Sequence, residues 1–288
     1  MDKRPFRSVL YIPASKERAL DKARTLAADA IIFDLEDAVA IDEKARAREL
    51  LTRTLQDVDY GARAKLVRIN ALGTVWGADD LDVIAQARPE AILLPKVDRA
   101  ADVTALARAL DARPETADTR IWAMVESPAG VLNAAEIARA PRMAGFIMGT
   151  NDLAKDMGCR HRPDRLPLLM ALQLPLIAAK AAGIMVVDGV YNAFRDEDGL
   201  RAECEQGRDM GFDGKTLIHP AQLAIANEVF APTEEELVLA QRQIAAFDAA
   251  LARGEGVAVV DGKIVENLHI VTAKQILARA KAIAELTE

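Results

Sequence analysis

Eight short apolar runs recur along the chain, and a stretch with helix-like spacing follows each of them. The runs read SVLYIPA, AIIFDLEDAV, KLVRIN, AILLPKV, IWAMVES, GFIMGTND, GIMVVDGVYN and GKTLIHPAQ. Continuous apolar runs are typical of strands that are covered on both faces, as in a parallel sheet wrapped by helices. The stretches between them, such as ADVTALARALDA, place apolar residues at helical intervals. The chain therefore reads as repeated strand-helix units.

A complete set of eight units favours a closed barrel over an open doubly wound sheet, and no GxGxxG follows the first strand. We predict an α/β fold, with a (β/α)8 TIM barrel as the catalytic domain over residues 1–230. Residues 231–288 are predicted to form a helix, a hairpin with its turn at Asp261-Gly262, and a last helix. This extension is surplus to a barrel, and we interpret it as a lid or an oligomerisation segment.

Composition narrows the class of protein. With 288 residues, of which 51% are hydrophobic, the chain can bury a large core. A net charge of −7 and the lack of a Lys/Arg-rich run argue against a nucleic-acid partner. No apolar run reaches the roughly 18 residues that span a bilayer, and residues 1–20 are too interrupted by charge for a signal peptide. We expect a cytoplasmic protein without a membrane partner.

Cys159 and Cys204 lack a CxxC pattern, so neither a disulfide framework nor a zinc site is expected.

Polar residues end the apolar runs. They are Asp34, Glu36, Asp37, Arg68, Lys96, Glu126, Asp152, Asp188, Lys215 and His219. The carboxyl ends of parallel barrel strands share one rim, so residues remote in sequence converge there. Because burying an unpaired charge is costly, we expect these groups to face water, each other or a ligand across a cleft.

Glu126 and Asp152 follow two neighbouring predicted strands, which lie about 5 Å apart in a sheet. Their carboxylates can therefore reach one cation. Two oxygen ligands, completed by water and substrate, suit Mg²⁺. The alternative is that each carboxylate caps the helix that follows it, for which Asp152 is a fair candidate.

Arg68 has two interpretations, which are compatible with each other. Its planar guanidinium can hold a substrate carboxylate through two hydrogen bonds. It can also pair with Glu36 or with another acid of the rim. Lys96 is interpreted as a charge balance for these acids. His219, which precedes Pro220, is interpreted as a structural hydrogen-bonding residue, with proton transfer as the alternative.

The first predicted helix begins with a basic cluster formed by Lys16, Arg18 and Lys22. Such a cluster at a helix amino terminus can hold the phosphates of an anionic cofactor. The alternative is a solvated helix face, which charged clusters commonly form.

Taken together, these motifs resemble a known family. RSVLYIPASKERALDKA, IIFDLEDAV, VRIN, ILLPKV, GTNDLAKDMG, VDGVYNAF and GFDGKTLIHPAQ are similar to the citrate lyase β-subunit-like family within the HpcH/HpaI aldolase superfamily. The resemblance runs from Arg7 to about Thr272. Within the family, GTNDLAKDMG, GLRAECEQGRDMGFDGKTLIHPAQL and VVDGKIVENLHI look most like the branch of malyl-CoA lyases and (3S)-malyl-CoA thioesterases.

The resemblance implies a (β/α)8 barrel that binds Mg²⁺ through Glu126 and Asp152 and assembles as a homotrimer or hexamer. It also implies that Arg68 holds the substrate. Arg7 and Lys16 are expected on the side that binds the coenzyme A of an acyl-CoA substrate.

In lyases of the family, the carboxy-terminal segment supplies a catalytic Asp to a neighbouring subunit, and the matching position here is Glu266. Arg68, Glu36 and Glu266 are thus the candidate catalytic residues. The longer Glu side chain shifts the carboxylate by about 1 Å, a misplacement that can cost about 100-fold in rate. This departure keeps hydrolysis open as an alternative to carbon-carbon cleavage.

The predicted activity is Mg²⁺-dependent cleavage of a malyl-CoA type 3-hydroxyacyl-CoA to acetyl-CoA and an oxoacid such as glyoxylate. One alternative is a (3S)-malyl-CoA thioesterase that releases malate and coenzyme A. Another is the β-subunit of a citrate lyase complex.

Overall fold

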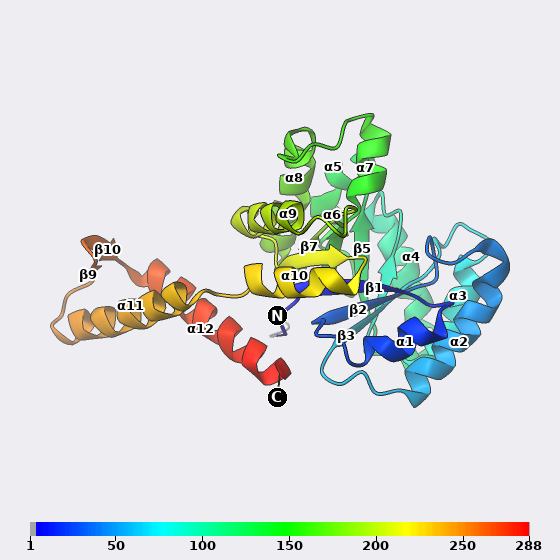
Figure 1. Cartoon of the computed structure of the whole chain (residues 1–288), viewed down its shortest axis with the longest axis horizontal. Helices are drawn as coiled ribbons and strands as arrows, with labels where there is room; N and C mark the ends of the chain where they lie inside the picture. Colours follow the sequence, from blue (N-terminus) through cyan, green and yellow to red (C-terminus); the bar gives the residue numbers. More distant parts are fainter. Residues whose placement is uncertain (1–3, 288) are drawn as a thin grey trace. The chain divides into compact units, whose positions relative to one another are not determined.

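Eight parallel strands close into a barrel in the first of two compact units (Figure 1). The structure is a computed structural model and describes residues 4–287. The first unit covers Phe6–Glu228. Its strands are β1 (Ser8–Pro13), β2 (Ala30–Asp34), β3 (Ala64–Arg68), β4 (Ala91–Leu94), β5 (Arg120–Val125), β6 (Met143–Met148), β7 (Met185–Asp188) and β8 (Gly214–Leu217). Each strand pairs with the next, and β8 pairs with β1 to complete the barrel.

Helices follow the strands along the chain and surround the barrel (Figure 1). They are α1 (Glu17–Ala23), α2 (Lys44–Asp57), α3 (Gly77–Ile84), α4 (Ala100–Asp111), α5 (Pro128–Leu132), α6 (Ala134–Ile137), α7 (Thr150–Met157), α8 (Leu169–Ala182), α9 (Glu197–Met210) and α10 (Leu223–Val229). Helix α4 buries Val103, Leu106 and Leu110 at the spacing of one helix face. The arrangement confirms the predicted (β/α)8 TIM barrel. Within residues 4–287, no helix is both long and apolar enough to cross a membrane.

Side chains from alternate strand positions fill the inside of the barrel. Val9 of β1, Ile32 of β2, Leu66 of β3 and Met124 of β5 belong to one buried cluster. Successive side chains of a strand point to opposite faces, so residues two positions apart share a face. The interior is therefore a packed core up to the carboxyl-terminal ends of the strands, where polar side chains take over.

A large aromatic side chain occupies this interior below the polar end. Trp122 of β5 is 3% exposed, and its ring centroid lies 5.0 Å from that of Phe6. Gly145 on the neighbouring strand β6 makes room for it, because a Cβ atom at Gly145 would lie 2.6 Å from the Trp122 ring. The ring is rigid, so its position in the barrel depends on this glycine.

The amino-terminal end of the barrel holds a buried ion pair. Arg7 directly precedes β1, and Asp29 directly precedes β2. Arg7 Nε and Nη2 donate to the two Asp29 carboxylate oxygens at 2.9 and 2.8 Å. Both side chains are less than a tenth exposed. The pair ties the starts of two adjacent strands together.

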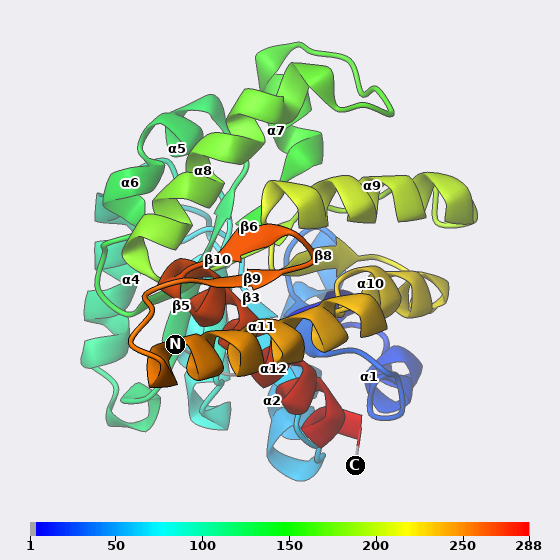
Figure 2. The same cartoon turned by 90° about the vertical axis from the view of Figure 1, so that its left-hand side faces the viewer.

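The second compact unit begins at Val229 and forms a helix, a hairpin and a helix (Figure 2). These are α11 (Glu234–Ala252), β9 (Ala258–Val260), β10 (Lys263–Val265) and α12 (Asn267–Thr287). Thr233 caps α11 through a reciprocal capping box with Glu236. Asp261 and Gly262 both have positive φ, which a tight hairpin turn requires. The unit has its own apolar cluster around Phe247, Val265 and Ile270, and these elements confirm the predicted extension.

We expect Gly145→Ala to destabilise the barrel by about 1–3 kcal/mol, because the added methyl group overlaps the Trp122 ring in a packed interior. Gly73→Ala is the matched control, since a Cβ atom at Gly73 meets nothing within 4 Å. Thermal unfolding followed by circular dichroism compares the two variants. Equal midpoints for both would contradict the packing argument.

Candidate functional site

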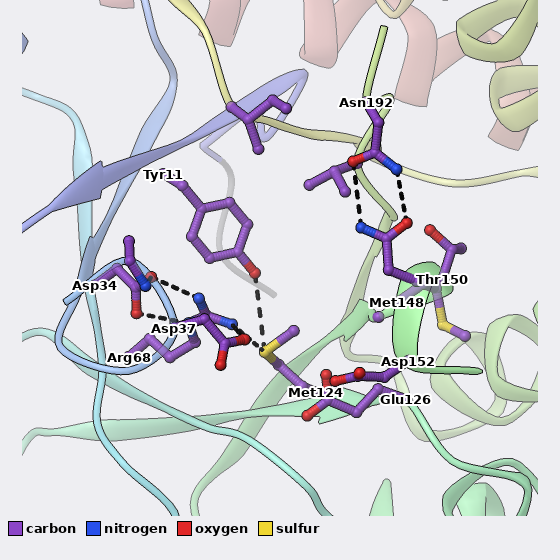
Figure 3. Close-up of a pocket in the computed structure, with 15 residues that line it drawn as sticks. Tyr11, Asp34, Asp37, Arg68, Met124, Glu126, Met148, Thr150, Asp152 and Asn192 are labelled. Carbon is purple, nitrogen blue, oxygen red and sulfur yellow. Dashed lines mark hydrogen bonds and ion pairs between the residues drawn. The ribbon is translucent and has the colours of Figure 1, made fainter. Parts of the chain in front are cut away.

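A cavity of about 350 Å³ opens at the carboxyl-terminal end of the barrel. Its lining combines ionisable side chains with Tyr11, Met124 and Met148 (Figure 3). Ligands bind at this end in (β/α)8 enzymes, because the loops after all eight strands meet there. The cavity is therefore the candidate active site.

The polar residues reach the cavity because they continue the inward-facing positions of their strands. Asp34 follows Ile32 by two residues, and Arg68 follows Leu66 in the same way. Tyr11 stands two residues beyond Val9. Because residues two positions apart on a strand share a face, the inward-facing positions of the core continue into the site.

Arg68 and Asp34 form a buried ion pair between the last residues of β3 and β2. The two residues are register partners in the sheet. Arg68 Nε donates to Asp34 Oδ1 at 2.7 Å, and Nη2 donates to Oδ2 at 2.5 Å. Burial alone would lower the pKa of Arg68, but the hydrogen bonds and charge of Asp34 raise it. Arg68 is therefore a fixed cation in the cavity wall.

Glu36 and Asp37 surround the same guanidinium. Glu36 Oε2 lies 2.9 Å from Arg68 Nη1, and Asp37 Oδ2 lies 3.5 Å from it. Burial raises the pKa of Glu36 to about 7, and the charge of Arg68 limits the rise. Asp37 lines the cavity, whereas Glu36 does not. The predicted pairing of Arg68 with Glu36 is thus present.

Glu126 and Asp152 lie on the opposite wall and meet at one cationic group. Lys96 Nζ is 3.5 Å from Glu126 Oε1 and forms an ion pair with Asp152 Oδ2. The Lys96 backbone N–H also donates to Glu126 Oε1 at 2.7 Å. Lys96 adopts a left-handed conformation with φ 54°, which is uncommon for a residue with a side chain. These contacts agree with the interpretation of Lys96 as a charge balance for the acids of the rim, although it was not among the predicted catalytic or binding residues.

A glycine brings the two acidic residues together. Gly149 is the N-cap of α7, and a Cβ atom there would lie 2.3 Å from Glu126 Cβ. Asp152 sits in the first turn of α7 and forms no cap, so the capping alternative for this residue is wrong. Burial raises the pKa of Glu126, while Lys96 opposes the rise.

The donor set suits a hard divalent cation. Carboxylate oxygens of Glu126 and Asp152 already converge on one positive group, Lys96. In the two clusters around Arg68 and Lys96, five acidic side chains surround two basic ones. Within residues 4–287, no cluster of three or more His, Cys, Asp or Glu side chains could hold a metal alone. Two carboxylates with water and substrate are a usual ligand set for Mg²⁺.

A second charged network fixes the loop after β7. Lys215 of β8 is fully buried and donates to Asp188, Glu203 and the Gly189 carbonyl. This loop carries Asn192, whose side-chain amide exchanges two hydrogen bonds with that of Asn151 on α7. The network therefore holds the part of the cavity wall that carries Asn151 and Asn192.

Other predicted site residues lie elsewhere. Arg7 is at the amino-terminal end of the barrel and is bound to Asp29, so we assign it a structural role instead of a contact with coenzyme A. Lys16 follows β1 at the cavity end, is 64% exposed and lies 3.8 Å from Glu43. Glu266 is an exposed residue before α12 in the second unit.

His219 has a local structural contact. Its Nδ1 accepts a hydrogen bond from the Ala221 backbone N–H at 3.2 Å, and its ring stacks on Phe194. The residue begins a short 3-10 helix, η5 (Pro220–Gln222). These contacts agree with the structural interpretation of His219.

Comparison with known proteins identifies the family. A model described as HpcH/HpaI aldolase/citrate lyase matches residues 7–220. The chain belongs to the HpcH/HpaI aldolase/citrate lyase family. Its membership confirms the resemblance of the sequence motifs.

Relatives within the HpcH/HpaI family align over almost the whole chain. A (3S)-malyl-CoA thioesterase of Cereibacter sphaeroides (strain KD131) is 66% identical over 280 residues, which cover 97% of this chain and 96% of that protein. The citrate lyase subunit beta of Leuconostoc mesenteroides subsp. cremoris is 39% identical over 282 residues, or 96% of this chain and 93% of that protein. Both belong to the kinds of enzyme that the sequence analysis compared.

A solved structure of the HpcH/HpaI family shares the fold. The protein CitE of Mycobacterium tuberculosis, in complex with magnesium, acetoacetate and coenzyme A, superposes with a TM-score of 0.81. It is 32% identical, and the match covers 97% of this chain and 99% of that one. That relative binds magnesium and coenzyme A at once.

We expect Glu36→Gln to change the pH dependence of stability. The folded pKa of about 7 exceeds the ordinary value of 4.5, so the carboxyl favours the folded state at low pH and loses this advantage as pH rises through 7. The variant should be more stable than the wild type by up to about 3 kcal/mol above pH 8, and similar to it near pH 4.5.

Urea unfolding at several pH values in a buffer with EDTA measures this difference. Glu49→Gln, on an exposed position of α2, is the matched control. A stability difference that does not vary with pH would contradict the raised pKa of Glu36.

Proposed function

We propose that the protein is a Mg²⁺-dependent thioesterase that hydrolyses (3S)-malyl-CoA to malate and coenzyme A. One observation carries the proposal: 66% identity over 97% of the chain to a protein named (3S)-malyl-CoA thioesterase. Hydrolysis was the alternative in the sequence analysis. We now place it ahead of carbon-carbon cleavage, because the citrate lyase subunits are more distant, at 39% identity.

Glu126 and Asp152 are the proposed Mg²⁺ ligands. When bound there, Mg²⁺ would polarise oxygen atoms of the hydroxy acid and offset the acidity of the site. The Lys96 backbone N–H orients Glu126, and Gly149 allows α7 to approach it. These contacts prepare the two carboxylates before substrate arrives.

Arg68 is proposed to hold an oxygen of the acyl group. Asp34 fixes the guanidinium plane through two hydrogen bonds, so Nη1, which Glu36 and Asp37 also approach, keeps one orientation at the cavity wall. Lys16 offers an exposed ammonium after β1, where it can bind phosphate groups of coenzyme A.

In hydrolysis, water forms the new bond to the thioester carbonyl carbon, the carbon-sulfur bond breaks, and the thiolate takes a proton.

Glu266 is proposed, on the resemblance, to provide the carboxylate that handles this proton for a neighbouring subunit. The enzyme is accordingly proposed to be a homotrimer or hexamer. We also retain the proposal that it works in the cytoplasm.

Incubation with (3S)-malyl-CoA and Mg²⁺ tests the reaction. We expect malate and free coenzyme A, identified by mass spectrometry and thiol titration, because hydrolysis leaves the carbon skeleton intact. Glyoxylate with acetyl-CoA would instead establish the lyase activity. No turnover of a free coenzyme A ester would favour a component that works only in a citrate lyase complex.

Glu126→Gln and Glu266→Gln should separate metal binding from proton transfer. Removing a residue that hydrogen-bonds to a metal ligand typically weakens metal binding about 10- to 100-fold. Glu126 is itself a proposed ligand, so Glu126→Gln should weaken Mg²⁺ binding at least about 10-fold. Glu266→Gln should bind Mg²⁺ normally and lose about 100-fold or more in kcat. Isothermal titration and steady-state kinetics measure the two effects.

Mixing the two variants provides a further check. If Glu266 serves a neighbouring subunit, mixed oligomers contain some sites with both native residues and regain activity. Normal Mg²⁺ binding by Glu126→Gln would contradict the metal site. A mixture without recovered activity would contradict a role for Glu266 in the neighbouring subunit.

A further inference from the structure

The Tyr11 hydroxyl lies at the cavity and has a weak hydrogen-bond acceptor. Its hydrogen-bond acceptor among residues 4–287 is Met124 Sδ, at 3.8 Å (Figure 3). A thioether is a weak acceptor, whereas a Tyr hydroxyl inside a protein usually finds a stronger partner. The ring packs on the barrel core, so the hydroxyl is held in place at the cavity wall.

Arg68 meets the same sulfur atom. Its Nη1 lies 3.7 Å from Met124 Sδ, and both contacts end on that atom in Figure 3. The guanidinium carbon lies 4.9 Å from the centroid of the Tyr11 ring, so the ring also braces the cation. Two donors from β1 and β3 therefore converge on one soft acceptor.

A negatively charged oxygen would satisfy these donors far better than sulfur does. Hydrogen bonds to an ionised acceptor are roughly twice as strong as neutral ones. Met124 has an unbranched, flexible side chain that can move aside for a ligand. The Met124 sulfur thus marks a position suited to an anionic oxygen.

Arg68 alone attracts such an oxygen only weakly, because nearby carboxylates offset its charge. Asp34 and Glu36 already lie within 2.9 Å of the guanidinium, and Asp37 adds a third carboxylate. A neutral donor adds binding energy without competing for these acids. Burial raises the pKa of Tyr11, so its hydroxyl keeps the proton that it donates.

We propose that Tyr11 donates a hydrogen bond to the terminal carboxylate of the acyl group, beside Arg68, and thereby selects carboxylate-bearing acyl chains. The inference rests on the proposed function and adds a specificity-determining residue to it. It assigns Tyr11 to direct contact with substrate, and not only to the barrel core.

Tyr11→Phe isolates the hydroxyl, because the ring and its packing are kept. A hydrogen bond to a charged group contributes about 1.5–3 kcal/mol, so kcat/KM for (3S)-malyl-CoA should fall about 10- to 100-fold. The loss should appear mainly in KM, since the carboxylate is bound in both ground and transition states. For 3-hydroxybutyryl-CoA, which has a methyl group in place of the carboxylate, kcat/KM should not change.

Tyr60→Phe is the matched control. The Tyr60 hydroxyl donates to the Leu20 carbonyl at 3.1 Å, and Tyr60 does not line the cavity. This variant should leave the ratio of kcat/KM values for the two esters unchanged. Circular dichroism melting of both variants checks that neither effect reflects unfolding.

Binding of L-malate in the presence of Mg²⁺ gives a second readout, which does not need turnover. Its dissociation constant should rise about 10-fold or more in Tyr11→Phe and stay constant in Tyr60→Phe. A wild-type protein that binds malate but does not hydrolyse malyl-CoA would contradict the proposed function alone. An unchanged ester ratio and malate affinity in Tyr11→Phe, or a wild-type protein that does not bind malate, would overturn the inference.

Discussion

The buried ion pair between Arg68 and Asp34 is the interaction on which the cavity depends. It joins the ends of two adjacent strands, and Asp34 also accepts hydrogen bonds from the Glu36 and Ala38 backbone N–H groups. One carboxylate therefore fixes both the guanidinium and the loop after β2. Removing one partner of a buried pair leaves the other charge unmatched, which typically costs about 3–5 kcal/mol. The barrel could keep its strands without this pair, but the shape of the cavity wall would not survive.

An excess of acid supports the proposal that the site binds a divalent cation. Arg68 is shared among Asp34, Glu36 and Asp37, and Lys96 is shared between the two acids on the other wall. Burial raises the pKa of Glu126 and of Glu36, and a nearby carboxylate, Asp152 or Asp37 respectively, adds to the rise. The proposed Mg²⁺ would offset this negative charge. The same surplus explains why a neutral hydroxyl at Tyr11 is useful beside a cation already neutralised by its neighbours.

The sequence predicted the parts of the site that follow from strand periodicity. Arg68 and Glu126 were found because charged residues end apolar runs, and such runs share one rim in a parallel barrel. Arg7 was misplaced because it precedes its strand, and residues before strands gather at the other end. Lys96 was undervalued because its role needs a left-handed backbone, which no spacing rule reveals. Tyr11 was hidden inside an apolar run, where only its position two residues beyond Val9 indicated that it faces inward.

The proposed metal ligands and the proposed acyl-selecting donor come from different strands, and this separation has an evolutionary consequence. Glu126 and Asp152 belong to the β5 and β6 side of the barrel, whereas Tyr11 belongs to β1. A duplicated gene could therefore exchange Tyr11 for another aromatic residue while its metal chemistry stays intact. Relatives of this kind would diverge in substrate preference before they diverge in mechanism. A protein engineer could make the same change with a single substitution at Tyr11.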